Sequence, residues 1–182
     1  MRDINLFGWT FSGAALAALL LFGAAAPAQV FSNHNSNAPV SFDAGRIELQ
    51  DRADRVVLSG AVRVEQAGLT LNADRMTVAY SNSGGVDINR IDAAGGVVVR
   101  KDGDVARGNS AIYDLDRRQI TMLGGVELLQ AGGNRLSGGR LVIELGSGRA
   151  IVDGRSSGGP TNPDTPSSGR VSGTFSVPQR GN

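Results

Sequence analysis

The side chains that could carry out catalysis or bind a metal are few and scattered. His34 is the only histidine of the chain and lies in a polar segment. Asp102 with Asp104, and Asp114 with Asp116, are carboxylate pairs that could serve a glycosidase or bind calcium weakly. Both pairs lie in turn-like segments, where Asp is favoured because its carboxylate accepts backbone hydrogen bonds. Because no third ligand or flanking motif accompanies them, we interpret His34 as a solvated side chain and the aspartates as turn residues.

Two glycine pairs, Gly95-Gly96 and Gly124-Gly125, are the other candidates, because glycine-rich loops can hold a phosphate group. A phosphate loop is followed by a helix, whereas strand-like sequence follows both pairs, so we interpret them as turns of a repeat. The chain has no cysteine, which removes thiolate chemistry and cysteine-based metal sites. We therefore expect no catalytic residue, no metal and no cofactor, and we keep a secreted carbohydrate-active enzyme as the alternative from a different class.

Charge also argues against one class of partner. The 182 residues include 18 Lys and Arg and 17 Asp and Glu, and these are spread along the chain with no block of one sign. A nucleic-acid-binding protein carries a concentrated basic surface. We expect no nucleic-acid partner.

The clearest organisation is an internal repeat. One phrase begins at residues 44, 73, 108 and 138, where it reads Ala-Gly-Arg-Ile-Glu-Leu, Ala-Asp-Arg-Met-Thr-Val, Gly-Asn-Ser-Ala-Ile-Tyr and Gly-Gly-Arg-Leu-Val-Ile. A second phrase begins at residues 60, 95 and 124 and reads Gly-Ala-Val-Arg-Val, Gly-Gly-Val-Val-Val and Gly-Gly-Val-Glu-Leu. Such self-similarity indicates a supersecondary unit that buries its apolar face only by stacking on copies of itself. A β-solenoid filament would need more, and more regular, repeats.

The repeat unit has the pattern of β-hairpins. Apolar and polar residues alternate with a period of two in segments such as 62–64, 69–71, 76–80, 120–122 and 126–128, as in strands with one buried face. Polar or Gly-containing breaks separate these segments. No sustained helical period follows residue 28, so we predict an all-β protein built from repeated hairpins.

Composition divides the chain into five segments. Residues 1–28 have an apolar run and an Ala26-Pro27-Ala28 site, which is typical of a signal peptide cleaved after Ala28; an uncleaved membrane anchor is the alternative. Residues 29–38 are polar and predict a flexible leader. Residues 39–154 form the β domain, residues 155–169 a disordered link rich in Gly, Ser and Pro, and residues 170–182 a possible closing strand with a C-terminal tail.

Parity within the repeats predicts an interior face that either a second sheet or a ligand must cover. The aliphatic and tyrosine side chains that share this parity line either a packed core or an apolar slot. They are Ile47, Leu49, Val62, Val64, Met76, Val78, Tyr80, Val97, Val99, Tyr113, Leu115, Val126, Leu128, Leu141 and Ile143.

Residues 55–78 resemble a known family signature. The family pattern has Thr-Gly-Asn-Val at a strand end, then Gln-Gly, then Leu-x-Ile/Leu-x-Ala-Asp-Lys/Arg followed by apolar alternation. This chain has Ser59-Gly60-Ala61-Val62, Gln66-Ala67-Gly68 and 69–75 at these places, and no copy keeps the asparagine. The chain is therefore similar to the OstA-like family of lipopolysaccharide transport proteins, which groups LptA, LptC and the N-terminal domain of LptD, and most resembles its LptA branch.

The resemblance implies an OstA-like β-jellyroll, in which two antiparallel sheets form an open, twisted V around an apolar groove. It implies a non-enzymatic periplasmic protein that binds the acyl chains of lipopolysaccharide (lipid A) and passes them from the inner to the outer membrane. The protomers would join end to end. An LptC-like protein would dock at the N-terminal edge and an LptD-like protein at the C-terminal edge, at Val40, Phe42, Val171, Phe175 and Val177. A membrane-anchored LptC-like protein remains the alternative.

Overall fold

The computed structural model describes residues 29–31, 33–82, 86–154 and 169–176. The expected signal peptide and most of the expected link lie outside these residues, as does Val177. Within the described residues, no helix has the length and hydropathy needed to cross a membrane. The described chain is almost entirely strand, which confirms the all-β prediction. Its elements are β1 Ser41–Asp43, β2 Arg46–Gln50, the 3-10 helix η1 Asp51–Ala53, β3 Arg55–Gln66, β4 Leu69–Ser81, β5 Asp87–Lys101, β6 Asp104–Asp114, β7 Gln119–Leu129, β8 Arg135–Glu144, β9 Arg149–Asp153 and β10 Ser172–Thr174.

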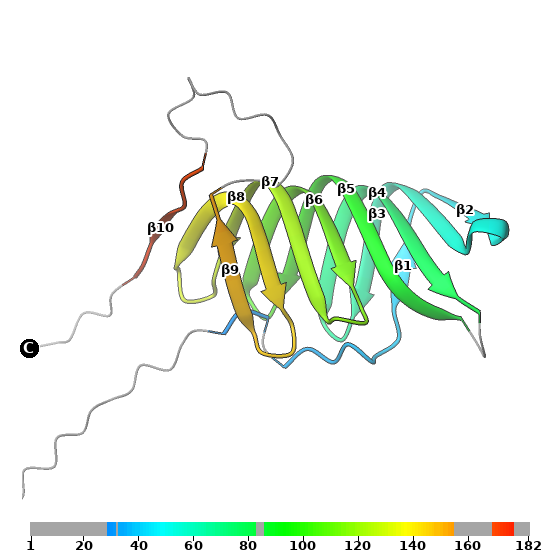
Figure 1. Cartoon of the computed structure of the whole chain (residues 1–182), viewed down its shortest axis with the longest axis horizontal. Helices are drawn as coiled ribbons and strands as arrows, with labels where there is room; N and C mark the ends of the chain where they lie inside the picture. Colours follow the sequence, from blue (N-terminus) through cyan, green and yellow to red (C-terminus); the bar gives the residue numbers. More distant parts are fainter. Residues whose placement is uncertain (1–28, 32, 83–85, 155–168, 177–182) are drawn as a thin grey trace, which may run out of the picture.

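The strands form one antiparallel sheet in which neighbours along the chain pair with each other from β3 to β8 (Figure 1). The two ends of the sheet are built differently from its middle. At the first end, β3 pairs with β2 through residues 55–59 and with β1 through residues 63–65. At the other end, β8 pairs with β10 through residues 135–137 and with β9 through residues 140–144.

Three alternate long strands, β3, β5 and β7, are each interrupted by a β-bulge near the middle. The register shifts between residues 59 and 62 of β3, 94 and 97 of β5, and 123 and 126 of β7. Two consecutive residues at each of these places have positive φ: 85° and 50° at Gly60-Ala61, 86° and 55° at Gly95-Gly96, and 79° and 58° at Gly124-Gly125. The interpretation of these pairs as turns between strands is therefore wrong. They are bulges inside strands, where left-handed backbone bends the strand.

The two sequence phrases meet at these bulges. A Cβ built on Gly95 would lie 2.7 Å from the Cβ of Asp74, and a Cβ built on Gly124 would lie 3.0 Å from the Cβ of Asn109. Gly60 faces Gly45 in the same way, and the Gly45 amide donates to the Gly60 carbonyl at 2.9 Å. The second residue of each of these three copies of the first phrase thus packs on the first glycine of the second phrase. We call this row of contacts the corner.

The corner divides the sheet into two layers. The first layer contains β2, β9 and residues 55–59, 75–81, 87–94, 110–114, 119–123 and 140–144 of the long strands. The second layer contains β1, β10 and residues 62–66, 69–73, 97–101, 104–108, 126–129 and 135–138. The two expected sheets are therefore two halves of one continuous hydrogen-bonded ladder, open at both ends.

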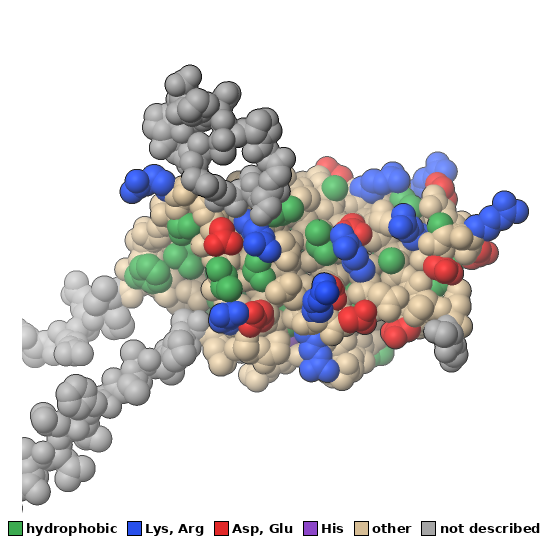
Figure 2. All heavy atoms as spheres, viewed as in Figure 1, with side chains coloured by type: hydrophobic (Ala, Val, Ile, Leu, Met, Phe, Trp, Pro, Cys, Tyr) green, Lys and Arg blue, Asp and Glu red, His purple; other side chains and the backbone are tan. Residues whose placement is uncertain are grey.

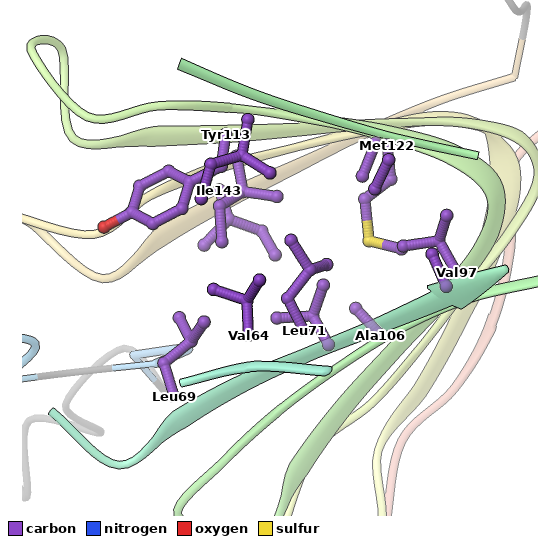
Figure 3. Close-up of a cluster of buried hydrophobic side chains, with 14 of the residues drawn as sticks. Val64, Leu69, Leu71, Val97, Ala106, Tyr113, Met122 and Ile143 are labelled. Atoms are coloured by element: carbon purple, nitrogen blue, oxygen red, sulfur yellow. The ribbon is translucent and has the colours of Figure 1, made fainter. Parts of the chain in front are cut away.

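The core lies between the two layers. Tyr113, Met122 and Ile143 of the first layer extend towards Val64 and Leu71 of the second (Figure 3). These side chains are all at most 2% exposed. The outer surface in view in Figure 2 carries charged side chains of both signs. They include ion pairs within one strand, such as Arg90–Asp92 of β5, and between strands, such as Arg107 of β6 with Glu127 of β7. The period-two pattern of the sequence therefore separates an apolar interior from a polar outer surface.

Substitution at the corner should test how far the fold depends on it. Gly95→Ala places a Cβ against Asp74 at a φ of 86°, so we expect a loss of about 2–4 kcal/mol in the free energy of unfolding, measured by urea denaturation. Gly96→Ala is the matched control. A Cβ there has no atom within 4 Å, and the equivalent position of β3 already carries Ala61, so we expect a loss of only about 1 kcal/mol. Equal effects of the two substitutions would contradict this account of the corner.

Candidate functional site

The interior between the layers holds most of the residues predicted from parity. Eleven of them are at most 4% exposed: Val62, Val64, Met76, Val78, Val97, Val99, Tyr113, Val126, Leu128, Leu141 and Ile143. Tyr80 and Leu115 are partly exposed. The middle of the interior is thus filled by the protein's own side chains.

The remaining two predicted interior residues lie at the first end of the sheet and are uncovered. Ile47 is 54% exposed and Leu49 is 60% exposed. Each is directly opposite a residue of β3, Ile47 opposite Leu58 and Leu49 opposite Val56. Residues directly opposite each other in an antiparallel pair project from the same face of the sheet. Ile47 and Leu49 therefore belong to the interior face, which continues beyond the buried core to an open end.

An apolar cavity of about 320 Å³ opens at this end. Phe42 of β1 and Leu49 of β2 lie on its wall, so both layers contribute to it. The other lining residues are Asp51, Val56, Val78, Tyr80, Asn82, Val86 and Ile88. Val86 is 73% exposed. The cavity is of the size of a small-molecule pocket, and its lining suits a hydrocarbon chain.

The side of the V opposite the corner, which we call the mouth, is crossed by residues 29–38. Figure 1 shows this leader segment (blue) running along the ends of the strands towards β1. Val30 and Phe31 are 2% and 1% exposed and belong to the core cluster. The Val30 amide donates to the Gly148 carbonyl at 2.8 Å, and the Phe31 amide donates to Asp104 Oδ2 at 3.0 Å.

This packing differs from the flexible leader that composition predicts. The segment is polar on average, and only Val30 and Phe31 carry large apolar side chains, so a window average conceals them. Adjacent residues do not produce a helical or strand period either. Burial of two side chains together with backbone hydrogen bonds is nevertheless enough to hold the segment against the domain.

A polar cluster continues along the leader segment and corrects the interpretation of His34. His34 Nε2 lies 3.2 Å from Gln66 Oε1 and 3.1 Å from the Tyr113 hydroxyl. The amide group of Gln66 donates to the carbonyls of Ser36 and Ala38, both at 2.9 Å. The Tyr113 hydroxyl donates to Gln66 Oε1 at 2.6 Å. His34 is therefore partly buried and hydrogen-bonded, not a solvated side chain.

The surroundings of this cluster shift two pKa values. Burial lowers the pKa of His34 below its ordinary value of 6.5; the hydrogen bond with Gln66 opposes this, and the positive charge of Lys101 adds to it. Burial raises the pKa of the Tyr113 hydroxyl. The cluster is thus most stable with His34 neutral, because a charged imidazole in this place loses solvation beside a cation.

Two of the four carboxylates noted in the sequence, those of Asp104 and Asp114, accept hydrogen bonds from backbone amides. Asp104 Oδ1 accepts from the Ala131 amide at 2.9 Å, while its other oxygen holds the leader segment. Asp114 Oδ1 accepts from the Arg117 amide at 2.8 Å. Among the residues that the structure describes, no three His, Cys, Asp or Glu side chains are grouped to hold a metal ion.

A second, larger cavity of about 570 Å³ lies between the leader segment and the strand ends. Its wall is mixed in character and includes Asn37, Gln66, Asp116 and Arg118 beside Leu115. This polar lining suits hydrocarbon less well than the cavity at the first end does.

The residues expected at the partner edges lie at the two ends of the sheet. Phe42 of β1 is 45% exposed, whereas Val40 precedes that strand and packs partly against the core. Val171 and Phe175 flank β10 and are 45% and 63% exposed.

The same alternation of apolar and polar residues, followed through every strand, also identifies several core residues that are not among the fifteen predicted interior residues. They include Leu58, Leu69, Leu71, Ile91, Ile120 and Met122, all at most 1% exposed. The signal is the same alternation, carried by the partner strands of the repeats. The burial of Val30 and Phe31 has no comparable signal.

The family model and the solved structure that this chain matches both belong to lipopolysaccharide transport proteins. A family described as LptA/(LptD N-terminal domain) LPS transport protein matches residues 42–149. An uncharacterized protein of Rhizobium meliloti (strain 1021), R00383, is 29% identical over 145 residues, which cover 73% of this chain and 78% of that protein. Among solved structures, the chain is similar to LptH of Pseudomonas aeruginosa, described as the LptA homologous periplasmic component of the lipopolysaccharide transport device. The TM-score is 0.64 at 18% identity, over 77% of this chain and 96% of that one.

Because of the His34 cluster, we expect the stability of the domain to decrease as the pH becomes mildly acidic. Because the folded-state pKa lies below 6.5, the neutral imidazole stabilises the fold fully above about pH 6.5, and this contribution is lost as the pH falls through the folded-state pKa. We expect the melting temperature of the protein to fall between about pH 7 and pH 5 more steeply than that of His34→Gln, which keeps hydrogen-bonding groups but does not titrate. Parallel melting curves for the two proteins would contradict this assignment.

Proposed function

Since the chain belongs to the LptA/(LptD N-terminal domain) family of lipopolysaccharide transport proteins, we propose that it is a non-enzymatic periplasmic carrier. It binds the acyl chains of lipopolysaccharide between its two layers and passes them from the inner to the outer membrane. The signal peptide is cleaved after Ala28. No bond is made or broken in this process, and no cofactor takes part.

The observation that carries this proposal is the continuity of the interior face. Apolar side chains run from the buried core through Val78 and Val56 to Leu49, which is uncovered at the open end. Burying hydrocarbon is favourable by about 0.8 kcal/mol per CH₂, so a lipid with several acyl chains needs a continuous apolar path through water. A transport path of this kind requires an apolar lining and an exit, and the first end supplies both.

The ends of the sheet favour strand addition as the mode of docking. An edge strand presents unpaired amide and carbonyl groups, which can pair with a strand from a partner. In this proposal β1 and β2 receive an LptC-like protein, β9 and β10 receive an LptD-like protein, and the same edges join copies of this chain end to end.

Two alternatives make different predictions. An anchored LptC-like protein would keep residues 1–28 in the membrane, which the intact mass of the exported protein distinguishes. A carbohydrate-active enzyme would need paired carboxylates facing a cleft, and the hydrogen bonds of Asp104 and Asp114 to backbone amides favour a turn role instead.

Photo-crosslinking at the open end tests lipid binding. We expect a photoreactive residue at position 49, on the interior face, to form an adduct with lipopolysaccharide in cells. Position 48 is the matched control, because Glu48 is the exposed neighbour of Leu49 in β2 and projects from the opposite face. Adducts of equal yield at both positions, or at neither, would argue against acyl chains in the interior.

Truncation tests the C-terminal edge. The short strand β10 is exposed throughout and pairs only with β8. We expect deletion of residues 170–182 to leave the melting temperature within a few degrees of the full chain and to weaken association with the LptD-like partner. Binding at the N-terminal edge serves as the internal control. Normal association of the truncated protein with that partner would show that the edge has been assigned wrongly.

A further inference from the structure

The leader segment crosses the mouth, the side of the V through which a lipid could enter the space between the two layers. The mouth is bounded by the turns of the two layers, with Gly148 on one side and Asp104 on the other. The leader segment is bonded to both, through Val30 and Phe31. Farther along, His34 lies within hydrogen-bond distance of Gln66 in the second layer and Tyr113 in the first. The segment therefore ties the two layers together across the opening.

We infer that the leader segment is a removable strap, whose Val30 and Phe31 side chains occupy an acyl-chain position and must leave when lipid enters through the mouth. This inference rests on the proposed lipid-carrier function. It adds to that function a competitor within the chain itself, which covers the mouth at Val30 and Phe31 in the empty protein.

The type of contact supports a removable element. Within its described residues the leader segment has no strand and adds no rung to the sheet ladder. It is held by single hydrogen bonds to a turn carbonyl and to side chains, and by two buried side chains. The layers themselves are held by the continuous ladder from β3 to β8, so the segment can leave without breaking a strand pair.

The apolar end of the strap is the part that resembles the ligand. Val30 and Phe31 lie in the same cluster as Val64, Leu71 and Val99, and they are the two large apolar side chains of an otherwise polar segment. A hydrocarbon chain could replace both side chains. The groups that lose a partner in the strap are the Gly148 carbonyl, Asp104 and the Gln66 amide. All three lie at the mouth, where water can replace the lost hydrogen bonds once the strap has left.

The geometry at Gly148 allows the strap to be locked. A Cβ built on Gly148 would lie 2.8 Å from the Cβ of Gln29, and a shift of about 1 Å gives the ~3.8 Å of a disulfide. The natural chain has no cysteine, so Gln29→Cys with Gly148→Cys introduces a single possible bridge. The same full-length protein can then be measured oxidised and reduced.

We expect the oxidised double variant to bind purified lipopolysaccharide about tenfold more weakly than its reduced form. The single variants, Gln29→Cys and Gly148→Cys, control for oxidation and for the strain at Gly148, and their affinity should not change with the redox state. Equal affinity of the oxidised and reduced double variant would overturn the inference. In the opposite direction, Val30→Ser with Phe31→Ser should bind about tenfold more tightly than the natural chain; unchanged affinity in a folded variant would also overturn it.

The experiments distinguish a failure of the strap inference from a failure of the proposed carrier function. If the natural chain forms the lipid adduct at position 49 and the lock has no effect, the strap is a fixed part of the fold and the carrier function stands. If neither the natural chain nor the reduced variant binds lipopolysaccharide, the proposed function fails and the strap inference fails with it.

Discussion

The bend that the left-handed bulges of β3, β5 and β7 impose on the sheet is the constraint on which the rest of the structure depends. Strands of 11 to 15 residues, such as β5 and β6, would form a flat sheet with one apolar face open to water. The positive φ angles at three consecutive bulges fold that sheet on itself, so that one apolar face covers its own other half. The interior, the mouth opposite the corner and the two open ends all follow from this one bend.

The bend creates one apolar interior, for which the leader segment and an acyl chain compete. Burying Val30 and Phe31 stabilises the closed mouth by about 1.5–3 kcal/mol for each side chain. About four to seven CH₂ groups buried at about 0.8 kcal/mol each would offset that amount. An acyl chain longer than this can replace the leader segment, whereas a short apolar solute cannot. A strap of only two apolar residues is thus weak enough to yield to a lipid and strong enough to keep the empty interior covered.

Much of the fold could be predicted from the sequence, because the alternation of apolar and polar residues in the repeats directly reflects the buried face of each strand. The glycine pairs are visible in the sequence as repeated elements, but a turn and a bulge have the same glycine pattern, since φ angles do not follow from residue type alone. Two exceptions to the alternation, Ile112 and Val142, are explained only by register. Both lie in one outward-facing row through Thr121. The position of the leader segment depends on contacts with residues 70 to 120 places away, such as Asp104 and Gly148, which no local pattern encodes.

The two ends of the sheet match each other in a way that favours head-to-tail association. The first-layer edge strands, β2 and β9, are each five residues long, and the second-layer edge strands, β1 and β10, are each three residues long. In the first layer, β9 runs towards the corner and β2 runs away from it; in the second layer, β10 runs away from the corner and β1 runs towards it. If two copies align their corners, β9 meets β2 and β10 meets β1, and both pairs are antiparallel, as in the rest of the sheet. The exposed Ile47 and Leu49 then continue the interior face from Ala150 and Val152 of the neighbouring copy, so strand addition at the ends would extend one apolar interior through both molecules.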